Sequence, residues 1–208
     1  MLIELHNLKP KYMSESEVSG SDIYLQPTVK FERGRKYMVC ARSGHGKTSL
    51  LNFIYGSSNA YDGTVLFHDD ESTPLERRRR KLSHLFQDLR LFPELTALEN
   101  VQIKNNLTEF KSTAQIEAML DRVLAPEKKH QPVATLSLGQ RQRVAAVRAL
   151  CQPFEFLLMD EPFSHLDLES SQAVAALVLS EVESQGAGLI VTALDPIGLF
   201  PFDVTLNL

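Results

Sequence analysis

The feature that most limits how this chain can fold is a glycine-rich segment that joins an apolar run to a helical pattern. Tyr37-Met-Val-Cys40 leads directly into Ala41-Arg-Ser-Gly-His-Gly-Lys-Thr-Ser49, and apolar residues with helical spacing then continue until Gly56. A strand, a loop and a helix in this order are typical of α/β proteins built on a parallel sheet. The segment therefore favours an α/β fold.

The loop Ala41–Ser49 has the residue types of a phosphate-binding loop. Its glycines allow backbone N–H groups to converge on an anion, and the helix that begins near Lys47 adds the positive end of its dipole. Lys47 would reach the β- and γ-phosphates, and the Thr48 hydroxyl would bind Mg²⁺. A surface turn with an incidental lysine is the alternative, which the strand–loop–helix context disfavours. We expect the phosphates to be bound by Ser43, Gly44, His45, Gly46, Lys47, Thr48 and Ser49.

A second apolar run ends in two carboxylates. Phe154–Met159 is uninterrupted, which is typical of a strand in a buried parallel sheet, and Asp160 and Glu161 follow it. Beside the phosphate loop, Asp160 would face Mg²⁺, and Glu161 could orient and deprotonate a water that attacks the γ-phosphate. An acidic turn ended by Pro162 would explain the same residues if the phosphate loop were absent.

The rest of the chain continues the alternation of strands and helices. This alternation predicts an α/β fold with a mostly parallel sheet, and 208 residues suit one domain. We expect strands at 1–12, 27–33, 36–40, 65–67, 82–86, 154–159 and 188–192. We expect helices from residue 47, at 75–81, within 94–130, at 139–151 and at 168–184.

Composition narrows the classes of function and the cellular location. A net charge of −4 argues against non-specific nucleic-acid binding, so the basic run Arg77–Lys81 is better interpreted as a solvated helix face than as a nucleic-acid or anionic-lipid site. There is no signal-peptide pattern and no apolar run near the ~20 residues that span a bilayer. We expect a cytoplasmic protein that meets a membrane only through a partner. Cys40 and Cys151 are expected to be buried free thiols.

Several motifs, in order along nearly the whole chain, resemble those of the ATP-binding-cassette (ABC) ATPases. Phe86–Asp88 resembles the family's Q-loop, and Leu91–Val101 resembles the start of its helical subdomain. Leu136–Gln140 resembles the signature segment, and Ser164–Asp167 resembles the D-loop. Asp160-Glu161-Pro162 fits the acidic strand end of the same family. Tyr12 falls where an aromatic residue normally stacks on adenine, with Tyr24 and Phe31 as alternatives.

The resemblance implies an architecture and a set of partners. It implies a P-loop NTPase core with a mostly parallel sheet, an antiparallel β subdomain and a small helical subdomain. Residues 1–87 and 141–208 would form the nucleotide-binding core, and 88–140 the helical subdomain with the signature. Members of the family bind ATP and Mg²⁺ in head-to-tail dimers of identical or different subunits. Dimer closure drives a transmembrane permease, which would hold the chain at the inner face of the cell membrane, and nucleic acid is no partner.

The resemblance also implies roles for single residues. Glu161, Lys47 and Gln87 would be catalytic, and Thr48, Gln87 and Asp160 would bind the metal. Ser137, Gly139 and Gln140 would contact the γ-phosphate bound by the other subunit, through a hydroxyl, a backbone N–H and a helix N-terminus. Asp167 of the D-loop is assigned to the nucleotide site with them.

Two positions depart from the family pattern. The segment Val191–Pro196 has Ala193 or Leu194 where the family has a histidine that contacts the γ-phosphate, and Leu138 replaces the first signature glycine. Each lost donor would cost a few kcal/mol of transition-state stabilisation, so we expect slow hydrolysis with intact ATP binding. His165 could replace the histidine, but its place in the D-loop favours the subunit interface. An ATP-dependent soluble switch or scaffold is the alternative function. The missing histidine and the altered signature slightly favour this alternative, whereas the transporter-like Leu91–Val101 segment favours transport.

Overall fold

The computed structural model describes residues 1–68 and 80–208. The predicted helix at 75–81 and the basic run Arg77–Lys81 therefore lie mostly outside the described residues. The strands are β1 (Leu2–Pro10), β2 (Val29–Glu32), β3 (Lys36–Cys40), β4 (Tyr61–His68), β5 (Leu82–Leu85), β6 (Phe156–Asp160), β7 (Gly188–Ala193) and β8 (Val204–Asn207). The helices are α1 (Lys47–Tyr55), α3 (Ala97–Asn105), α4 (Thr113–Asp121), α5 (Leu138–Leu150) and α6 (Leu168–Ser184), with 3₁₀ turns at Pro126–Lys128 and Val133–Thr135.

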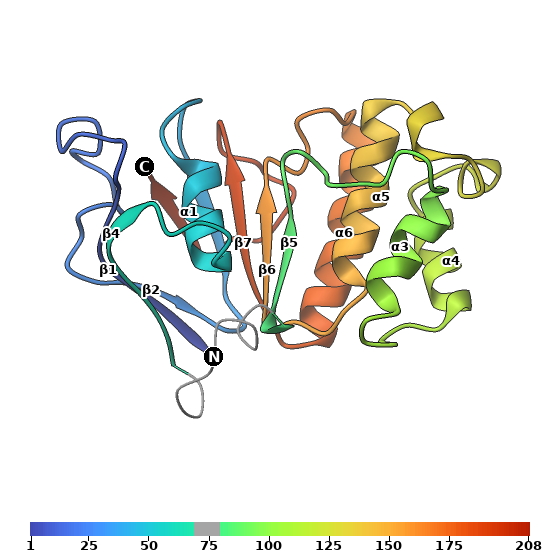
Figure 1. Ribbon diagram of the computed structural model, residues 1–208, viewed down its shortest axis with the longest axis horizontal. Coiled ribbons are helices and arrows are strands. Elements are labelled where there is room, and N and C mark those ends of the chain that lie inside the picture. The colour runs from blue at the N-terminus through green and yellow to red at the C-terminus, as the bar shows by residue number, and fades with distance from the viewer. Residues whose placement is uncertain (69–79) are drawn as a thin grey trace.

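A five-stranded sheet lies at the centre of the fold, in the order β5-β6-β7-β3-β8, and each neighbouring pair is parallel. Both faces of this sheet are covered. Along β6, Phe156 and Leu158 join the hydrophobic cluster that contains α1, whereas Leu157 and Met159 join the cluster that contains α5 and α6. Figure 1 shows α1 on one side of the strands and α5 and α6 on the other. Burial on both faces explains why the β6 sequence is apolar without alternation.

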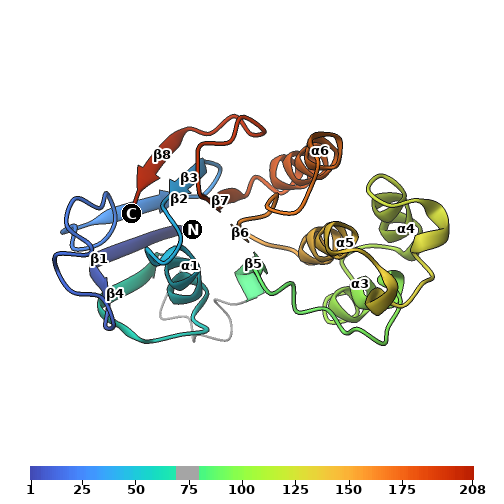
Figure 2. The ribbon, with the colours of Figure 1, turned by 90° about the horizontal axis from the view of Figure 1, so that it is seen from above.

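A second, antiparallel sheet of three strands has the order β2-β1-β4 and lies beside α1 (Figure 2). Apolar residues alternate along β1 up to Leu5, and the alternation then shifts by one residue so that Leu8 is also buried. The shift occurs at Asn7, which has a left-handed φ of 46° and lies where the β1–β4 register is irregular. A β-bulge of this kind keeps the apolar face of the strand on the core.

The helical side of the molecule is built on α5. The helices α3 and α4 pack on α5 and lie at the end of the molecule opposite the antiparallel sheet (Figure 1). Each begins with a capping box, formed by Thr96 with Glu99 and by Ser112 with Gln115. Helical periodicity was expected across 94–130, and the structure divides this region into two helices and a 3₁₀ turn. The predicted subdomain boundary at residue 140 falls within α5.

Two strands differ from the sequence expectation. The strand β4 covers Tyr61–His68, whereas only 65–67 was expected, because Asp62 and Gly63 are residue types that strands disfavour. Its pairing with β1 imposes the longer extended conformation. The short strand β8 was not predicted, and it forms by adding to β3 along the edge of the parallel sheet.

The cysteines agree with the prediction, since Cys40 and Cys151 are both buried and free. None of the helices in the described part of the chain combines the length and the apolar character required to span a bilayer.

Candidate nucleotide-binding site

The glycine-rich loop follows β3 and ends where α1 begins. Gly44 and Gly46 have left-handed φ values of 83° and 87°, which disfavour any residue with a side chain. The carbonyl of Gly46 accepts a hydrogen bond of 2.8 Å from the Tyr24 hydroxyl, and a Cβ at position 46 would lie 2.8 Å from that same oxygen. The buried Tyr24 hydroxyl therefore supports the loop from the side of the core, and this close approach requires glycine at position 46.

Tyr24 and Phe31, the two alternatives for an adenine platform, are both buried in the core. Burial raises the pKa of the Tyr24 hydroxyl, so this group remains a neutral donor beneath the loop. Tyr12, in contrast, is 60% exposed, and its hydroxyl lies 2.6 Å from Oγ of Ser49. Of the three aromatic candidates, only Tyr12 offers a free ring beside the phosphate loop.

Lys47 connects the loop to the acidic end of β6. Its side chain is almost completely buried, and Nζ donates to the carbonyl oxygens of Ala41 at 2.6 Å and Arg42 at 3.0 Å. The same nitrogen lies 3.2 Å from Oε1 of Glu161. The lysine charge is thus held at one point between the loop and the carboxylate, which suits the binding of a phosphate group.

Asp160 is buried and has one carboxylate oxygen without a partner. Oδ1 accepts a hydrogen bond of 2.6 Å from the Thr192 hydroxyl, whereas Oδ2 is buried and makes no hydrogen bond within the described structure. Burial raises the pKa of Asp160, and the hydrogen bond from the Thr192 side chain offsets part of that rise. An orphaned buried oxygen of this kind fits a cation, which would satisfy it and favour the ionised form.

The residues around Asp160 have the oxygen ligands that Mg²⁺ prefers. The Thr48 hydroxyl donates to Oε1 of Gln87 at 3.1 Å. These two side chains, both predicted to bind the metal, therefore meet at the start of α1. Within the described residues no group of three His, Cys, Asp or Glu side chains could hold a metal ion. A site with one carboxylate and neutral oxygens is typical of Mg²⁺ bound together with substrate phosphates. The residues present therefore fit this ion.

Glu161 adopts a strained backbone conformation, with a left-handed φ of 47°. Three hydrogen bonds support it. Its N–H is 3.2 Å from both the carbonyl oxygen and the hydroxyl of Thr192, and its carbonyl accepts a bond of 3.1 Å from the side-chain amide of Gln142. These bonds orient the carboxylate that was predicted to be the general base.

Sequence reasoning did not identify Thr192 or Gln142 as supports of the site. Thr192 is fully buried in β7, between the apolar residues Val191 and Ala193. A polar residue inside an otherwise apolar strand is the signal that could have identified it. Gln142 is likewise buried, although it lies on a helix rich in polar residues, where no such contrast exists.

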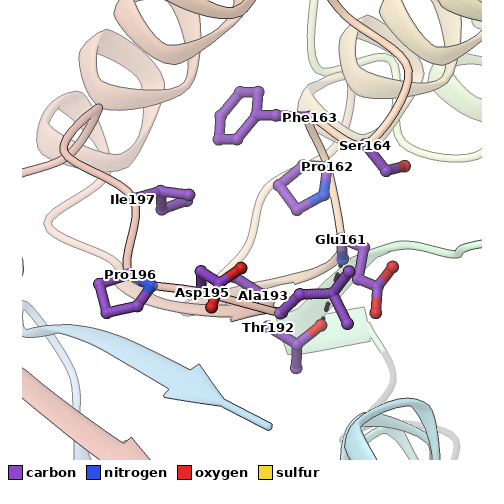
Figure 3. A pocket seen from close by; sticks show the side chains of 10 residues that line it. Glu161, Pro162, Phe163, Ser164, Thr192, Ala193, Asp195, Pro196 and Ile197 are labelled. Atoms are coloured by element: carbon purple, nitrogen blue, oxygen red, sulfur yellow. Dashed lines mark hydrogen bonds between the residues drawn. The ribbon is translucent and has the colours of Figure 1, made fainter. Parts of the chain in front are cut away.

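Two cavities meet at Glu161. The first has a volume of about 310 Å³ and is lined by Tyr12, Ser43, Gly44, Gly46, Lys47, Thr48, Ser49, Gln87 and Glu161. The second has a volume of about 240 Å³ and lies between residues 161–164 and 192–197 (Figure 3). The predicted phosphate-loop residues thus line the first cavity, except that the His45 side chain lines a different pocket, together with Arg42 and Cys40.

The remaining predicted residues form a separate group at the N-terminus of α5. Ser137 accepts a hydrogen bond from the N–H of Gln140, and Oε1 of Gln140 accepts one from the N–H of Ser137. A Cβ at Gly139 would lie 2.7 Å from the carbonyl oxygen of His165, so the D-loop packs directly on this helix turn. Asp167 caps α6 by accepting a bond of 2.7 Å from the N–H of Ser170.

The two groups lie at different places along one edge of the molecule. In Figure 1 the N-termini of α1 and α5 both lie at the upper edge, where β6 and β7 end, and the parallel strands separate them. Ser137, Gly139, Gln140 and Asp167 do not line the cavity that contains Lys47. Within one chain, the residues predicted to contact nucleotide therefore form two separate groups. We call the group around Lys47 the phosphate-loop half-site and the group at the N-terminus of α5 the signature half-site.

Known proteins share both the sequence and the fold of this chain. A family model described as "ABC transporter" matches residues 25–164. The lipoprotein-releasing system ATP-binding protein LolD of Idiomarina loihiensis is 33% identical over 203 residues, which are 90% of this chain and 88% of the relative. The sulfate/thiosulfate import ATP-binding protein CysA of Nitrosomonas europaea is 32% identical over 192 residues, which are 85% of this chain but only 49% of the relative.

Two solved structures of one cassette give the same result. The dimeric structure of MJ0796, a bacterial ABC transporter cassette, aligns with a TM-score of 0.77 at 26% identity and covers 99% of this chain and 94% of the neighbour. A dimeric post-hydrolysis state of the same cassette, bound to ADP and Pi, aligns with a TM-score of 0.73, also at 26% identity, over 93% of this chain and 88% of the neighbour. The chain therefore belongs to the ABC transporter family, as an ATP-binding subunit of the ABC ATPase type.

Proposed function

We propose that this chain binds ATP with Mg²⁺ at the Ala41–Ser49 loop and hydrolyses it in a head-to-tail dimer, which powers a transmembrane permease. The observation that carries the proposal is the convergence of Lys47, Asp160 and Glu161 at one end of the parallel sheet. Phosphoryl transfer to water requires groups of these kinds: the fixed ammonium group of Lys47, the buried unpaired carboxylate oxygen of Asp160 and the second carboxylate of Glu161.

Each group has a part in the reaction. Lys47 and the backbone N–H groups of the loop bind and orient the phosphates, and Tyr12 stacks on the adenine. Asp160, Thr48 and Gln87 would hold Mg²⁺, which supplies positive charge against the phosphate oxygens. Glu161 accepts a proton from the attacking water through its side-chain carboxylate. The hydrogen bonds of Thr192 to the Glu161 backbone keep that carboxylate directed at the site.

The second half-site belongs to another subunit. Ser137 uses its hydroxyl oxygen as a hydrogen-bond acceptor in the capping box, which leaves its O–H free to donate to a phosphate oxygen. The N-terminal end of α5 adds unpaired N–H groups and a positive dipole end. Because these groups are separated from the phosphate loop of their own chain, they would serve the ATP of a partner. The dimeric structures of MJ0796 support this arrangement.

Hydrolysis is proposed to be slower than in cassettes that carry the family's histidine. Ala193 has no side-chain donor, and Leu138 places an exposed apolar side chain next to Ser137. Neither change affects the residues that line the cavity of Lys47. ATP binding is therefore retained while stabilisation of the transition state is reduced. Turnover equal to that of an ordinary cassette, at saturating ATP with the permease present, would contradict this part.

A groove between the parallel sheet and the helical side is the proposed place of permease docking. It has a volume of about 250 Å³, and the residues that line it include Arg90, Phe92, Ile103 and Leu107. Phe92 is 52% exposed and Leu107 76% exposed, and neighbouring exposed apolar residues of this size are typical of interaction surfaces. Leu91 instead packs partly against the core. A substitution at Phe92 therefore tests docking more cleanly than one at Leu91.

Two experiments test the proposal. Glu161→Gln should form a stable dimer in ATP and Mg²⁺, as measured by light scattering after size-exclusion chromatography, because it binds ATP without hydrolysing it. A Glu161→Gln chain that stays monomeric would contradict the homodimer.

In detergent extracts the wild-type chain should co-purify with an integral membrane protein, and the Phe92→Ala variant should lose that protein. The control variant Leu66→Ala, which changes a matched exposed residue on β4, should retain it. Failure of the wild-type chain to retain a membrane protein would favour a soluble switch.

A further inference from the structure

We propose that His165 of one subunit contacts the γ-phosphate bound by the other subunit and there replaces the histidine that position 193 lacks. The inference rests on the proposed head-to-tail dimer. It assigns the residual turnover of this chain to a donor that one subunit supplies to its partner. Four observations lead to it.

The first observation is that His165 is fixed to the signature segment. Its N–H donates to Oε1 of Gln142 at 3.3 Å, and its carbonyl oxygen packs so closely on Gly139 that a Cβ there would clash with it. Both contacts are made to the first turns of α5. Any partner that meets Ser137 and Gly139 therefore meets the D-loop histidine in the same approach.

The second observation is that the imidazole of His165 has a free end. The side chain is exposed, and Nδ1 lies 2.9 Å from the Ser164 hydroxyl. When Ser164 donates to Nδ1, the hydrogen of the neutral ring is on Nε2, which is then a donor. In that arrangement Ser164 orients the ring and leaves Nε2–H available for a phosphate oxygen.

The third observation is the cavity beside Glu161 shown in Figure 3. Ala193 forms part of its wall, and its other apolar residues include Pro162, Phe163 and Ile197. The small side chain at position 193 leaves room for a ring.

The fourth observation concerns which groups are linked to each other. The side chain of Glu161 is linked to the phosphate loop through the Lys47 ion pair of 3.2 Å, whereas only its backbone carbonyl is linked to α5, through Gln142. We therefore assign the cavity beside its carboxylate to the phosphate-loop half-site. His165 belongs to the signature half-site and lines neither the cavity of Lys47 nor that of Ala193 in its own chain. In a head-to-tail dimer, the two-fold axis places the signature half-site of each subunit against the phosphate-loop half-site of the other. Each His165 would then lie at the cavity of the partner subunit.

Ser164, the neighbour of His165, lines the cavity in its own chain, so contact within one subunit is the competing arrangement. A cross-linking experiment separates the two. One chain carries Glu161→Gln and His165→Cys, and a second chain carries Glu161→Gln and Ala193→Cys. The two are mixed in ATP and Mg²⁺ with a short bifunctional thiol reagent. We expect a covalent dimer that requires ATP.

The control replaces His165→Cys with His130→Cys, an exposed histidine on the helical side, and should give no covalent dimer. The native Cys40 and Cys151 are buried, so the unsubstituted Glu161→Gln chain should also remain uncross-linked. A dimer that forms with ATP but does not cross-link would overturn the histidine assignment and leave the proposed function intact. Absence of any ATP-dependent dimer would overturn both.

Turnover provides an independent test. His165→Ala should lower the ATPase rate by about 100-fold, the usual effect of one lost transition-state donor. Mixing His165→Ala with Glu161→Gln, each of them weakly active alone, should raise the rate above the sum of the two. In the mixed dimer one site then has both the wild-type Glu161 and the partner's wild-type histidine. If His165 acted within its own chain, the mixed dimer would have no complete site and the rate would not rise.

Discussion

The hydroxyl of Thr192 joins the two acidic residues of the site, and Thr192→Val removes it while keeping the shape of the side chain. In the wild type this hydroxyl donates to Oδ1 of Asp160 at 2.6 Å and lies 3.2 Å from the N–H of Glu161. That N–H retains a second acceptor, the carbonyl oxygen of Thr192. The free energy of unfolding should therefore fall mainly through the loss of one buried hydrogen bond to a carboxylate, which contributes about 2 kcal/mol.

The effect should appear in two measurements. With a urea m-value of about 2.5 kcal/mol/M for a chain of this size, the unfolding midpoint should fall by about 1 M. The hydrogen bond from Thr192 also lowers the pKa of Asp160, so its loss should raise that pKa further. The apparent Mg²⁺ affinity in the presence of ATP should also fall by about tenfold, because the hydroxyl that orients the metal-binding carboxylate is lost.

Thr205→Val is the matched control, because Thr205 lies exposed on β8 and its hydroxyl contacts neither acidic residue. A surface substitution of this kind should change stability by less than about 0.5 kcal/mol. If Thr192→Val unfolded at the same urea concentration as the wild type and required no more Mg²⁺, the hydroxyl would not support the site as inferred.

Three further predictions follow from other contacts. Burial, together with the charge of Arg90, lowers the pKa of His84 to about 3. The folded protein should therefore lose stability as pH falls from about 6.5 towards 3, and His84→Phe should flatten the unfolding free energy over that range. The pKa of Glu4 is lowered to about 2, chiefly by its hydrogen bond with Lys30. The stability that Glu4 contributes is present above its unfolded pKa and disappears as pH falls towards 2, so Glu4→Gln should weaken the acid dependence measured by circular dichroism. Gly46→Ala should lower both the melting temperature and the ATP affinity, because φ is 87° and the new Cβ would meet Tyr24, whereas Gly198→Ala has free space and should change neither.

Local patterns were sufficient for the parts of the site that are contiguous in sequence. A strand, a glycine-rich turn and the start of a helix follow one another directly at Ala41–Ser49, so their order in the chain already places Lys47 and Thr48 at a helix N-terminus. The apolar run before Asp160 has the composition of a strand buried on both faces, which predicted its place in a parallel sheet. Gly56, with a left-handed φ of 75°, ends α1 as expected.

Tertiary structure alone decided which distant groups meet. Tyr24 was open as an adenine platform from sequence, but the packing of its ring beneath Gly46 buries it and makes it a support of the loop. Thr192 reaches Asp160 only because β6 and β7 are neighbours, and Gln142 reaches Glu161 only because α5 packs beside the end of β6. Such contacts depend on strand order and helix packing, which no local pattern contains.

The division into two half-sites is also a tertiary property. The resemblance to ABC ATPases predicted that the phosphate loop and the signature segment of one chain serve different nucleotides, and each segment forms from residues close in sequence. Their separation follows from the parallel strands that lie between α1 and α5 (Figure 1). The sequence by itself determined which groups can bind phosphate, since that depends on residue type and local backbone. The order of the strands determined that one chain cannot bring them together, since packed strands hold the two helices apart.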